Sequence, residues 1–353
     1  MAAKNSEGRQ LLRTKRRRTL LEDILPRVQA ESGLSREETL VREMIETSLK
    51  LLRDETGVGD IKILNAALRE LRYAFRVFAP WKGVPKVSVF GSARTKPDEP
   101  AYRTAVEFSR RVAEHGYMVI TGGGHGIMRA CQEGAGRERS FAVNIRLPWE
   151  QEPNEFIVGD PKLVTHRYFF TRKLMFVKEA DALVCFPGGF GTLDEGFEAL
   201  TLMQTGKSHP MPIVFLDAPR GTYWKTWQRY VEDHLLRRNL ISAEDLSLFR
   251  VTTHVDEAVE EITRFYRVYH SARWVGHRFV LRLKKKLDPA FVARLAQEFS
   301  ALVAAGTIEQ RDALDEEREQ EPALNDLPRL VWEGTKHGFA LRRRLIDRIN
   351  AEA

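Results

Sequence analysis

The sequence predicts an α/β protein with a doubly wound parallel sheet, because short apolar runs alternate with helix-forming stretches through its central part. These apolar runs fit strands that are buried on both faces. The expected strands cover residues 86–90, 117–121, 141–145, 182–186 and 212–216, with a last short piece from Val251. The expected helices cover about residues 100–115, 126–135, 168–179, 192–204, 222–237 and 255–269.

An N-terminal helical extension is expected before this core, which we place at residues 81–270. Apolar residues recur near helical spacing over residues 36–79, and Gly57-Val-Gly59 divides that stretch into two helices. We assign residues 21–80 to the extension and residues 1–20 to a disordered basic tail.

A small C-terminal α+β appendage is expected at residues 271–353. Its predicted order is strand, helix, strand, helix, and its second strand follows an acidic loop at residues 312–321. The four elements cover residues 274–284, 289–304, 327–333 and 339–350. The appendage contains no recognisable catalytic signature.

The charge of the chain is concentrated at its N-terminus. The formal net charge is +7, and residues 1–30 alone hold eight basic and three acidic residues. Binding of nucleic acid through Lys15-Arg-Arg-Arg18 is one interpretation, but a single run of this length is more often a solvated arm. We therefore expect no nucleic-acid partner.

A cytoplasmic protein is expected from the remaining composition. No apolar stretch approaches the roughly 18 residues of a spanning helix, and the first residues do not form a signal peptide. Cys131 and Cys185 are too few for a disulfide framework, and both lie in surroundings typical of buried, inert thiols.

Three glycine-bearing turns directly follow three of the expected strands. They are Gly91-Ser92-Ala93, Gly122-Gly123-Gly124-His125-Gly126 and Gly188-Gly189-Phe190-Gly191-Thr192. Ligands of an open parallel sheet bind beyond the carboxyl ends of its strands, so the three turns share one edge. Glycine lets the backbone approach a phosphate closely, and the following helix presents free N–H groups. The turns favour an anionic, nucleotide-like ligand over a purely structural role.

Two common nucleotide sites are disfavoured. The first two turns lack the Gly-x-Gly-x-x-Gly spacing, and Asn144-Ile-Arg146 ends its strand without the acidic residue that holds an adenosine ribose. This disfavours NAD. No turn has the lysine of a phosphate-binding P-loop, which disfavours ATP hydrolysis. We expect neither a cofactor nor a metal ion.

Two side chains near this edge are candidates for chemistry. Glu195 lies in the first turn of the helix after Thr192, where the helix dipole favours its ionised form. An ionised carboxylate suits stabilisation of an oxocarbenium-like ribose and is a poor general acid. Arg172 lies near the start of the helix after Leu163-Val-Thr165, and its guanidinium can bind a phosphate or a carboxylate. The neighbouring Lys173 is expected to point elsewhere and is assigned no role.

These motifs together resemble the LONELY GUY (LOG) family, whose signature is PGGxGTxxE preceded by an Arg-Lys pair. The matching residues are Arg172-Lys173 and Pro187-Gly-Gly-Phe-Gly-Thr-Leu-Asp-Glu195, at the family's spacing. Thr121-Gly-Gly-Gly-His-Gly-Ile-Met128 and Phe90-Gly-Ser-Ala93 resemble two further loops of the family. The tract from Asn144 to Asn154 resembles its longer bacterial branch, whose members are often labelled lysine decarboxylase.

The resemblance implies a Rossmann-like fold and phosphoribohydrolase activity on a purine nucleoside 5′-monophosphate, either a cytokinin riboside monophosphate or AMP. It implies catalytic roles for Arg172 and Glu195, and homodimers or larger assemblies. It also implies a set of substrate-binding residues, with Met128 near the base: Ser92, Gly122, Gly123, Gly124, Met128, Gly188, Gly189, Gly191 and Thr192. The rival hypothesis is a non-catalytic carrier of a nucleotide or of the molybdenum cofactor, since proteins with a similar glycine pattern do this. The presence of both Arg172 and Glu195 favours the enzyme.

Overall fold

The computed structural model describes residues 35–147, 152–318, 320–335 and 337–352. The predicted basic tail at residues 1–20 and the first part of the helical extension, residues 21–34, lie outside the described residues. The chain divides into two compact units, one ending at Arg72 and the other beginning at Tyr73.

Two helices begin the described chain: α2 (Arg36–Arg53) and α3 (Val58–Phe78). The Ser35 hydroxyl accepts a hydrogen bond from the Glu38 backbone N–H, and the Glu38 carboxylate accepts one from the Ser35 N–H. This capping box satisfies donors at the start of α2 that would otherwise lack partners. The two predicted helices and the break between them are confirmed.

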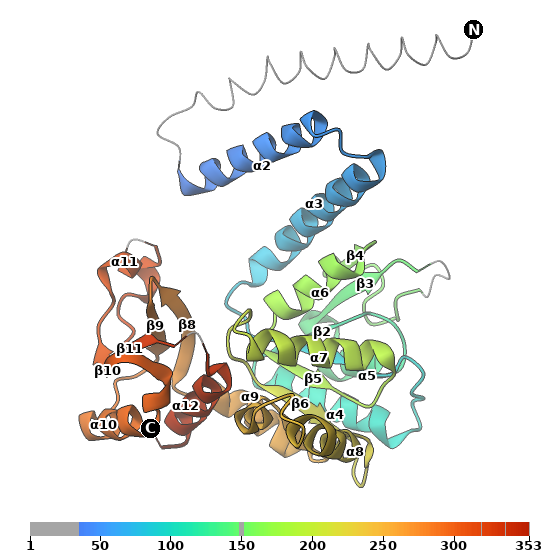
Figure 1. The fold of residues 1–353 in the computed structure, drawn as a ribbon. Coiled ribbons are helices and arrows are strands. Elements are labelled where there is room, and N and C mark those ends of the chain that lie inside the picture. Colours follow the sequence, from blue (N-terminus) through green and yellow to red (C-terminus); the bar gives the residue numbers. More distant parts are fainter. Residues whose placement is uncertain (1–34, 148–151, 319, 336, 353) are drawn as a thin grey trace. The chain divides into compact units, whose positions relative to one another are not determined.

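The second unit is built on a parallel sheet of seven strands in the order β4-β3-β2-β1-β5-β6-β7 (Figure 1). Its first strand, β1, pairs with β2 through Val87 and Val119 and with β5 through Val87 and Ala182. The strands are β1 (Lys86–Phe90), β2 (Met118–Thr121), β3 (Ser140–Ile145), β4 (Leu163–His166), β5 (Ala182–Cys185), β6 (Ile213–Leu216) and β7 (Arg250–Thr252). Every predicted strand is present. The edge strand β4 was not among them, because its residues alternate in burial and its apolar run is only Leu163-Val164.

Helices cover both faces of this sheet, as the doubly wound pattern predicts. Apolar side chains of α4 (Pro100–Glu114), α5 (Ile127–Ala135) and α9 (Val255–Phe265) share one buried core with Val87 and Val89 of β1. The other face is covered by α6 (Phe169–Lys178), α7 (Phe190–Gln204) and α8 (Tyr223–Tyr230), the last continued by a π-helical turn at Val231–Leu236. The predicted fold class, Rossmann-like α/β, is therefore confirmed.

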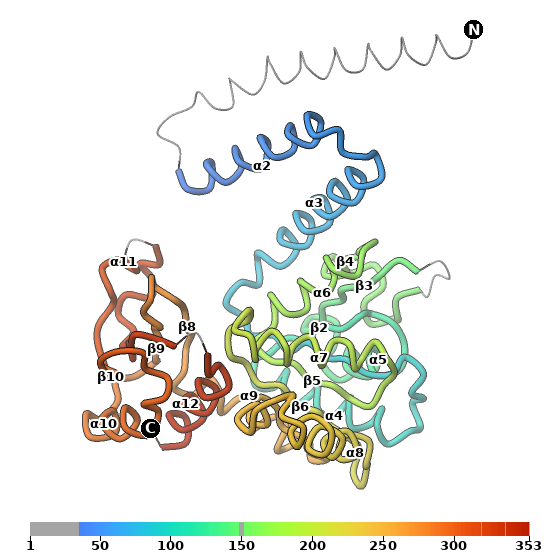
Figure 2. The backbone as a smooth tube through the Cα atoms, in the orientation of Figure 1, coloured from blue at the N-terminus to red at the C-terminus, as the bar shows by residue number. Residues whose placement is uncertain are grey.

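The strand order reverses between β1 and β5, the point at which open α/β sheets have a ligand-binding crevice. From β1 the chain proceeds outward through β2, β3 and β4, and then returns to β5 on the other side of β1. Strands β2, β3, β4 and β5 are labelled in Figure 2. Ligands of open α/β sheets bind at such a point, outside the carboxyl ends of the strands.

The C-terminal part contains an antiparallel sheet of four strands in the order β10-β11-β9-β8. The strands are β8 (Tyr269–Val275), β9 (Arg278–Leu283), β10 (Val303–Arg311) and β11 (Arg329–Gly334). Helices α10 (Pro289–Glu298) and α12 (Phe339–Glu352) pack on one face through Phe291, Leu295, Leu345 and Ile349. The short helix α11 (Asp315–Arg318) follows β10.

The predicted order of the appendage, strand-helix-strand-helix, is wrong in two places. The single strand expected at 274–284 is a hairpin, because Gly276 has a φ of +59° and turns the chain after Val275. The helix expected to reach residue 304 ends at Glu298, and a strand begins at Val303. The acidic loop expected at 312–321 includes helix α11. The two helices and the α+β character of the appendage are as expected.

Two further expectations concern burial. Cys131 and Cys185 are both free and fully buried, as predicted. Burial raises the pKa of both thiols, which keeps them protonated and unreactive at neutral pH. Among the described residues, no helix has the length and the apolar character needed to cross a lipid bilayer.

Candidate active site

The three glycine-bearing turns meet at the crevice between β1 and β5. The backbone N–H of Ser92 donates to the carbonyl of Pro187 over 3.1 Å, and the N–H of Ile127 donates to the carbonyl of Ser92 over 3.0 Å. Ser92 therefore connects the turn after β1 to the turns after β2 and β5. The sequence-based prediction that these turns share one edge is confirmed.

Glycines in these turns serve two different purposes. A Cβ atom on Gly126, whose φ is +62°, would lie 2.2 Å from the Ser92 carbonyl oxygen. One on Gly188 would lie 2.2 Å from the Thr192 hydroxyl. These two glycines allow the turns to pack together. A Cβ on Gly189 or Gly191 would meet nothing within 4 Å, so the backbone there faces open space at the N-terminus of α7. Such a position suits a phosphate.

Arg172 lies over the second turn. A Cβ on Gly122 would fall 2.5 Å from an Arg172 guanidinium nitrogen and 2.7 Å from the Met128 sulfur. The Arg172 Nε donates to the Val143 carbonyl over 2.8 Å, and the guanidinium carbon lies 5.1 Å from the centre of the Phe176 ring. The structure thus brings together Gly122, Met128 and Arg172, which the sequence placed on different elements.

Glu195 is buried, and its protonation differs from the sequence-based expectation. Its side chain projects from α7 and the residue is 6% exposed. Burial raises the pKa of Glu195 to about 7, against the lowering effects of Lys173 and Arg172. We expected the helix dipole to keep this carboxylate fully ionised; desolvation outweighs it. Glu195 therefore exists in both protonation states near neutral pH.

Lys173 does have a role at the site, contrary to the expectation that it points elsewhere. Its ammonium lies 2.9 Å from the Asp194 carboxylate, 2.8 Å from the Glu198 carboxylate and 3.8 Å from the nearer oxygen of Glu195. Among the described residues it is the cation nearest to Glu195, and it lowers the pKa of that acid. Arg172 and Lys173 are adjacent on α6, and both act electrostatically on Glu195.

Asn154 supports the second turn from beneath. It is 1% exposed, and its amide nitrogen donates to the carbonyls of Gly123 and Gly124 over 3.1 and 2.8 Å and to the Gln132 side chain over 2.6 Å. Its own backbone N–H donates to the Gly123 carbonyl. The sequence placed Asn154 only at the end of a tract, of which residues 148–151 lie outside the described residues. The sequence offered only the position of this asparagine at the end of a loop, because its burial is visible only in the structure.

Tyr223 supports the third turn. This first residue of α8 donates its hydroxyl hydrogen bond to the carbonyl of Gly188 over 2.6 Å. The backbone N–H of Tyr223 donates to the Asp217 carboxylate at the end of β6. Sequence reasoning predicted the helix but assigned Tyr223 no role, because nothing in its local pattern connects it to a turn 35 residues earlier.

The arrangement combines an open helix N-terminus for an anion, a half-buried cation and a buried acid of adjustable charge. Among the described residues, no cluster of three or more His, Cys, Asp or Glu side chains has the geometry of a metal site. The chemistry available to these groups is charge stabilisation and proton transfer.

Comparison with known proteins places this site in a family. A family model described as "Possible lysine decarboxylase" matches residues 125–262. An uncharacterised protein of Archaeoglobus fulgidus is 32% identical over 111 residues, which cover 31% of this chain and 70% of that protein. A cytokinin riboside 5′-monophosphate phosphoribohydrolase of Arabidopsis thaliana is 25% identical over 193 residues, 50% of this chain and 85% of that enzyme. The chain belongs to the LONELY GUY (LOG) family.

Other relatives of this LOG family member cover smaller shares of its length. A cytokinin riboside 5′-monophosphate phosphoribohydrolase of Mycobacterium tuberculosis is 31% identical over 121 residues, 32% of this chain and 60% of that enzyme. Among solved structures, the molybdenum cofactor binding protein of Rippkaea orientalis is 17% identical with a TM-score of 0.37, and the match covers 51% of this chain and 95% of that one. The fold assignment of this LOG family member rests on its own strand order.

Proposed function

We propose that this LOG family member hydrolyses the N-glycosidic bond of a purine nucleoside 5′-monophosphate to give the free base and ribose 5-phosphate. The observation that carries the proposal is the convergence of Arg172 and Glu195 at the crevice between β1 and β5. Two groups that the sequence places 23 positions apart lie close enough there to shift each other's pKa. The names of the relatives from Arabidopsis and Mycobacterium support the same reaction class.

The proposed binding mode follows from where the backbone is open. The 5′-phosphate lies at Gly189 and Gly191, where free N–H groups begin α7 and no side chain occupies the space. The ribose then lies toward Glu195, one helical turn further on. The base lies toward Met128, whose sulfur is close to Gly122 and Arg172.

In the proposed reaction, the ionised form of Glu195 stabilises positive charge on the ribose as the glycosidic bond breaks. The same carboxylate orients the water that attacks the anomeric carbon. This water supplies the hydroxyl group of ribose 5-phosphate, and the proton that it loses is passed through solvent to the departing base. Arg172 keeps Glu195 partly ionised and positions the substrate against the second turn. Because the acid is buried, its charge acts through little intervening water.

The test is a product assay across nucleoside monophosphates. Purified protein is incubated with AMP and with isopentenyladenosine monophosphate, and free base is quantified by chromatography. We expect release of base, and a decrease in kcat of about 10²–10³-fold in both Arg172→Ala and Glu195→Ala. Lys178→Ala, on the same helix as Arg172 but on its exposed surface, is the matched control and should retain activity.

Two results would reject the proposal. Full activity in Glu195→Ala would show that the mechanism is wrong. Tight binding of a nucleotide or pterin ligand with no turnover of any monophosphate would favour the carrier hypothesis instead.

We also propose that the protein assembles as a homodimer or a larger homo-oligomer, as the family resemblance implies. Phe169, Phe170 and Leu174 of α6 are about half exposed beside the site, and Phe190 at the start of α7 is 92% exposed. Large apolar side chains gathered on a surface mark interaction sites. Light scattering coupled to gel filtration should give a mass of at least twice 40.6 kDa, and a Phe169→Glu/Leu174→Glu variant should lower it. A monomeric wild-type mass would contradict this.

A further inference from the structure

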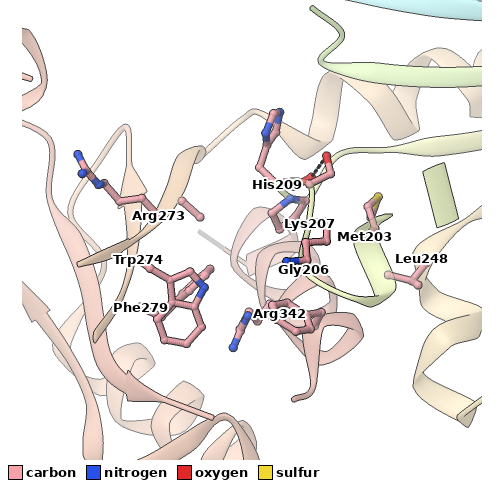
Figure 3. A pocket seen from close by; sticks show the side chains of 13 residues that line it. Met203, Gly206, Lys207, His209, Leu248, Arg273, Trp274, Phe279 and Arg342 are labelled. Atoms are coloured by element: carbon pink, nitrogen blue, oxygen red, sulfur yellow. Dashed lines mark hydrogen bonds between the residues drawn. The ribbon is translucent and has the colours of Figure 1, made fainter. Parts of the chain in front are cut away.

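A cavity lies away from the candidate active site, between the loop after α7 and the C-terminal sheet. Its volume is about 160 Å³. Gly206 and Lys207 of the loop line one side, and Arg273 and Trp274 of β8 line another (Figure 3). Arg342, from the first turns of α12, lines the cavity between them. Nothing in the proposed reaction uses this cavity.

Arg342 is the unusual residue of this cavity. It is 1% exposed, and its guanidinium carbon lies 4.2 Å from the ring of Phe339, 4.4 Å from Phe279 and 4.9 Å from Trp274. One guanidinium nitrogen donates to the Thr335 carbonyl over 2.7 Å. The other two, Nε and Nη1, are buried and have no hydrogen-bond partner among the described residues.

Arg342 is also not neutralised by a carboxylate. No Asp or Glu lines the cavity, and no ion pair of Arg342 occurs in the described part of the chain. Burial lowers the pKa of Arg342 to about 10 with no opposing contribution, so the guanidinium is still charged at neutral pH. A buried charge without a counter-ion is costly, which makes it a signature of a missing anion.

Its neighbour in sequence provides the contrast. Arg343 is equally buried, at 3% exposed, but its guanidinium contacts the carboxylates of Glu261 and Asp347. Two consecutive arginines on one helix therefore have opposite environments. The folded chain supplies carboxylate counter-ions to Arg343, whereas Arg342 faces the cavity.

The other charged groups of the cavity also favour an anion. Lys207 lies in the lining, and Arg273 does too, although its guanidinium is paired with Glu321 over 2.8 Å. The cavity adjoins the C-terminus of α7, where carbonyl groups without hydrogen-bond partners would repel an anion. Two of these carbonyls already accept hydrogen bonds: that of Met203 from the Gly206 N–H, and that of Leu202 from the Lys207 N–H.

We propose that this cavity binds a small phosphate-type anion, either inorganic phosphate or a phosphate monoester, through the guanidinium of Arg342. The volume is close to that of a cavity known to hold a benzene-sized molecule, which is large enough for phosphate with a short substituent. Charge-assisted hydrogen bonds to a phosphate oxygen would satisfy the buried nitrogens of Arg342.

The experiment separates this cavity from the candidate active site with a blocking substitution. Gly191→Glu places a carboxylate at the open N-terminus of α7, where a Cβ meets nothing within 4 Å, and repels phosphate from that site. In this background the Tm is measured against increasing inorganic phosphate, with ionic strength held constant by KCl. Glycerol 3-phosphate and acetate are titrated in parallel.

A ligand that binds the native state raises the Tm in a saturable way. We expect inorganic phosphate or glycerol 3-phosphate to raise it by several degrees at about a hundredfold excess over Kd, and acetate to have no such effect. The more effective of the two phosphates identifies free phosphate or an ester as the ligand. The shift should disappear in Gly191→Glu/Arg342→Met and persist in Gly191→Glu/Arg343→Met, the matched control.

Should Arg342→Met fail to fold, Lys207→Glu in the same background keeps the test decisive. Lys207 is exposed, and reversing its charge at the cavity should raise the Kd for phosphate severalfold. The proposal is overturned if Gly191→Glu shows no saturable shift, if the shift survives both Arg342→Met and Lys207→Glu, or if acetate is as effective as phosphate. None of these readouts depends on enzymatic activity.

Discussion

Two buried glutamates, one in each sheet-containing part of the molecule, are treated in opposite ways. Glu317 of the C-terminal part is fully buried, and its carboxylate lies 2.5 Å from Arg282 and 3.4 Å from Arg329. Glu195, on helix α7 beside the parallel sheet, is nearly as buried, but its nearest cation among the described residues, Lys173, is 3.8 Å away and is shared with two other acids. The charge of Glu317 is neutralised by two arginines, whereas Glu195 can gain or lose its proton near neutral pH.

The pairing around Glu317 solves a local problem of the antiparallel sheet. Arg282 and Arg329 are directly opposite each other on β9 and β11, and like charges at that position are destabilising. The carboxylate of Glu317 lies between them from helix α11. Comparing the two glutamates shows that two carboxylates of similar burial can differ in how completely they are paired with cations.

The largest effect is expected from breaking the paired site. Glu317→Ala removes the carboxylate between two buried arginines, of which Arg282 keeps its ion pair with Glu321, and should lower the free energy of unfolding by about 3–5 kcal/mol, measured by urea denaturation. The control is Glu316→Ala, whose exposed ion pair with Arg278 should contribute less than about 1 kcal/mol. Equal losses in the two variants would contradict this account of the C-terminal charges.

Removing the charge of the incompletely paired Glu195 is expected to increase stability. The folded protein holds a proton on Glu195 up to about pH 7, whereas the unfolded chain releases it near pH 4.5. Stability therefore falls as the pH rises between these values, and the deficit persists above them. Glu195→Gln removes it and should raise the free energy of unfolding by about 2 kcal/mol at pH 8.

The same variant should show no stabilisation at pH 4, where Glu195 is protonated in both states. Urea denaturation at the two pH values measures the difference. A Glu195→Gln variant that is less stable than wild type at pH 8 would show that burial of the ionised carboxylate does not destabilise the folded state.

The smallest effect is expected from Lys173, which we infer to be a positioning residue. If the ionised form of Glu195 is the active one, kcat/KM should increase with pH through about 7. Lys173→Met removes the nearest cation and should move that midpoint upward by up to about one pH unit. Lys178→Met, on the same helix, should leave the profile unchanged. A profile that falls above pH 7 would instead assign Glu195 to proton donation.

The central strands of the parallel sheet were predictable because they are buried on both faces, so that they form short and mostly apolar runs such as Ile213–Leu216. The C-terminal sheet was harder because its strands differ. Edge strand β10 is largely exposed, contains Gly306 and carries no alternation of apolar residues. In the β8–β9 hairpin, a turn of two residues, Gly276 and His277, separates two strands that look like one strand in the sequence.

The residues of the candidate site could be predicted from the sequence, but their pKa values could not. Arg172 and Glu195 follow from strand ends and motif spacing, which local sequence determines. The pKa of Glu195 and the position of Lys173 depend on how α6 and α7 pack side by side on the sheet, and no local pattern encodes that distance. Asn154 and Tyr223 act through contacts between distant segments for the same reason.

Helix α7 extends from the candidate active site to the cavity of Arg342. Its first residues form the open turn at Gly189–Gly191, and its last, with the loop to Gly206, borders the cavity of Arg342. Its 15 residues span about 22 Å as one stiff rod. In mechanical terms, a rod shared by two sites transmits an axial displacement from one end to the other almost undiminished. A substitution that loosens the loop after Gln204 would therefore displace the side chain of Glu195.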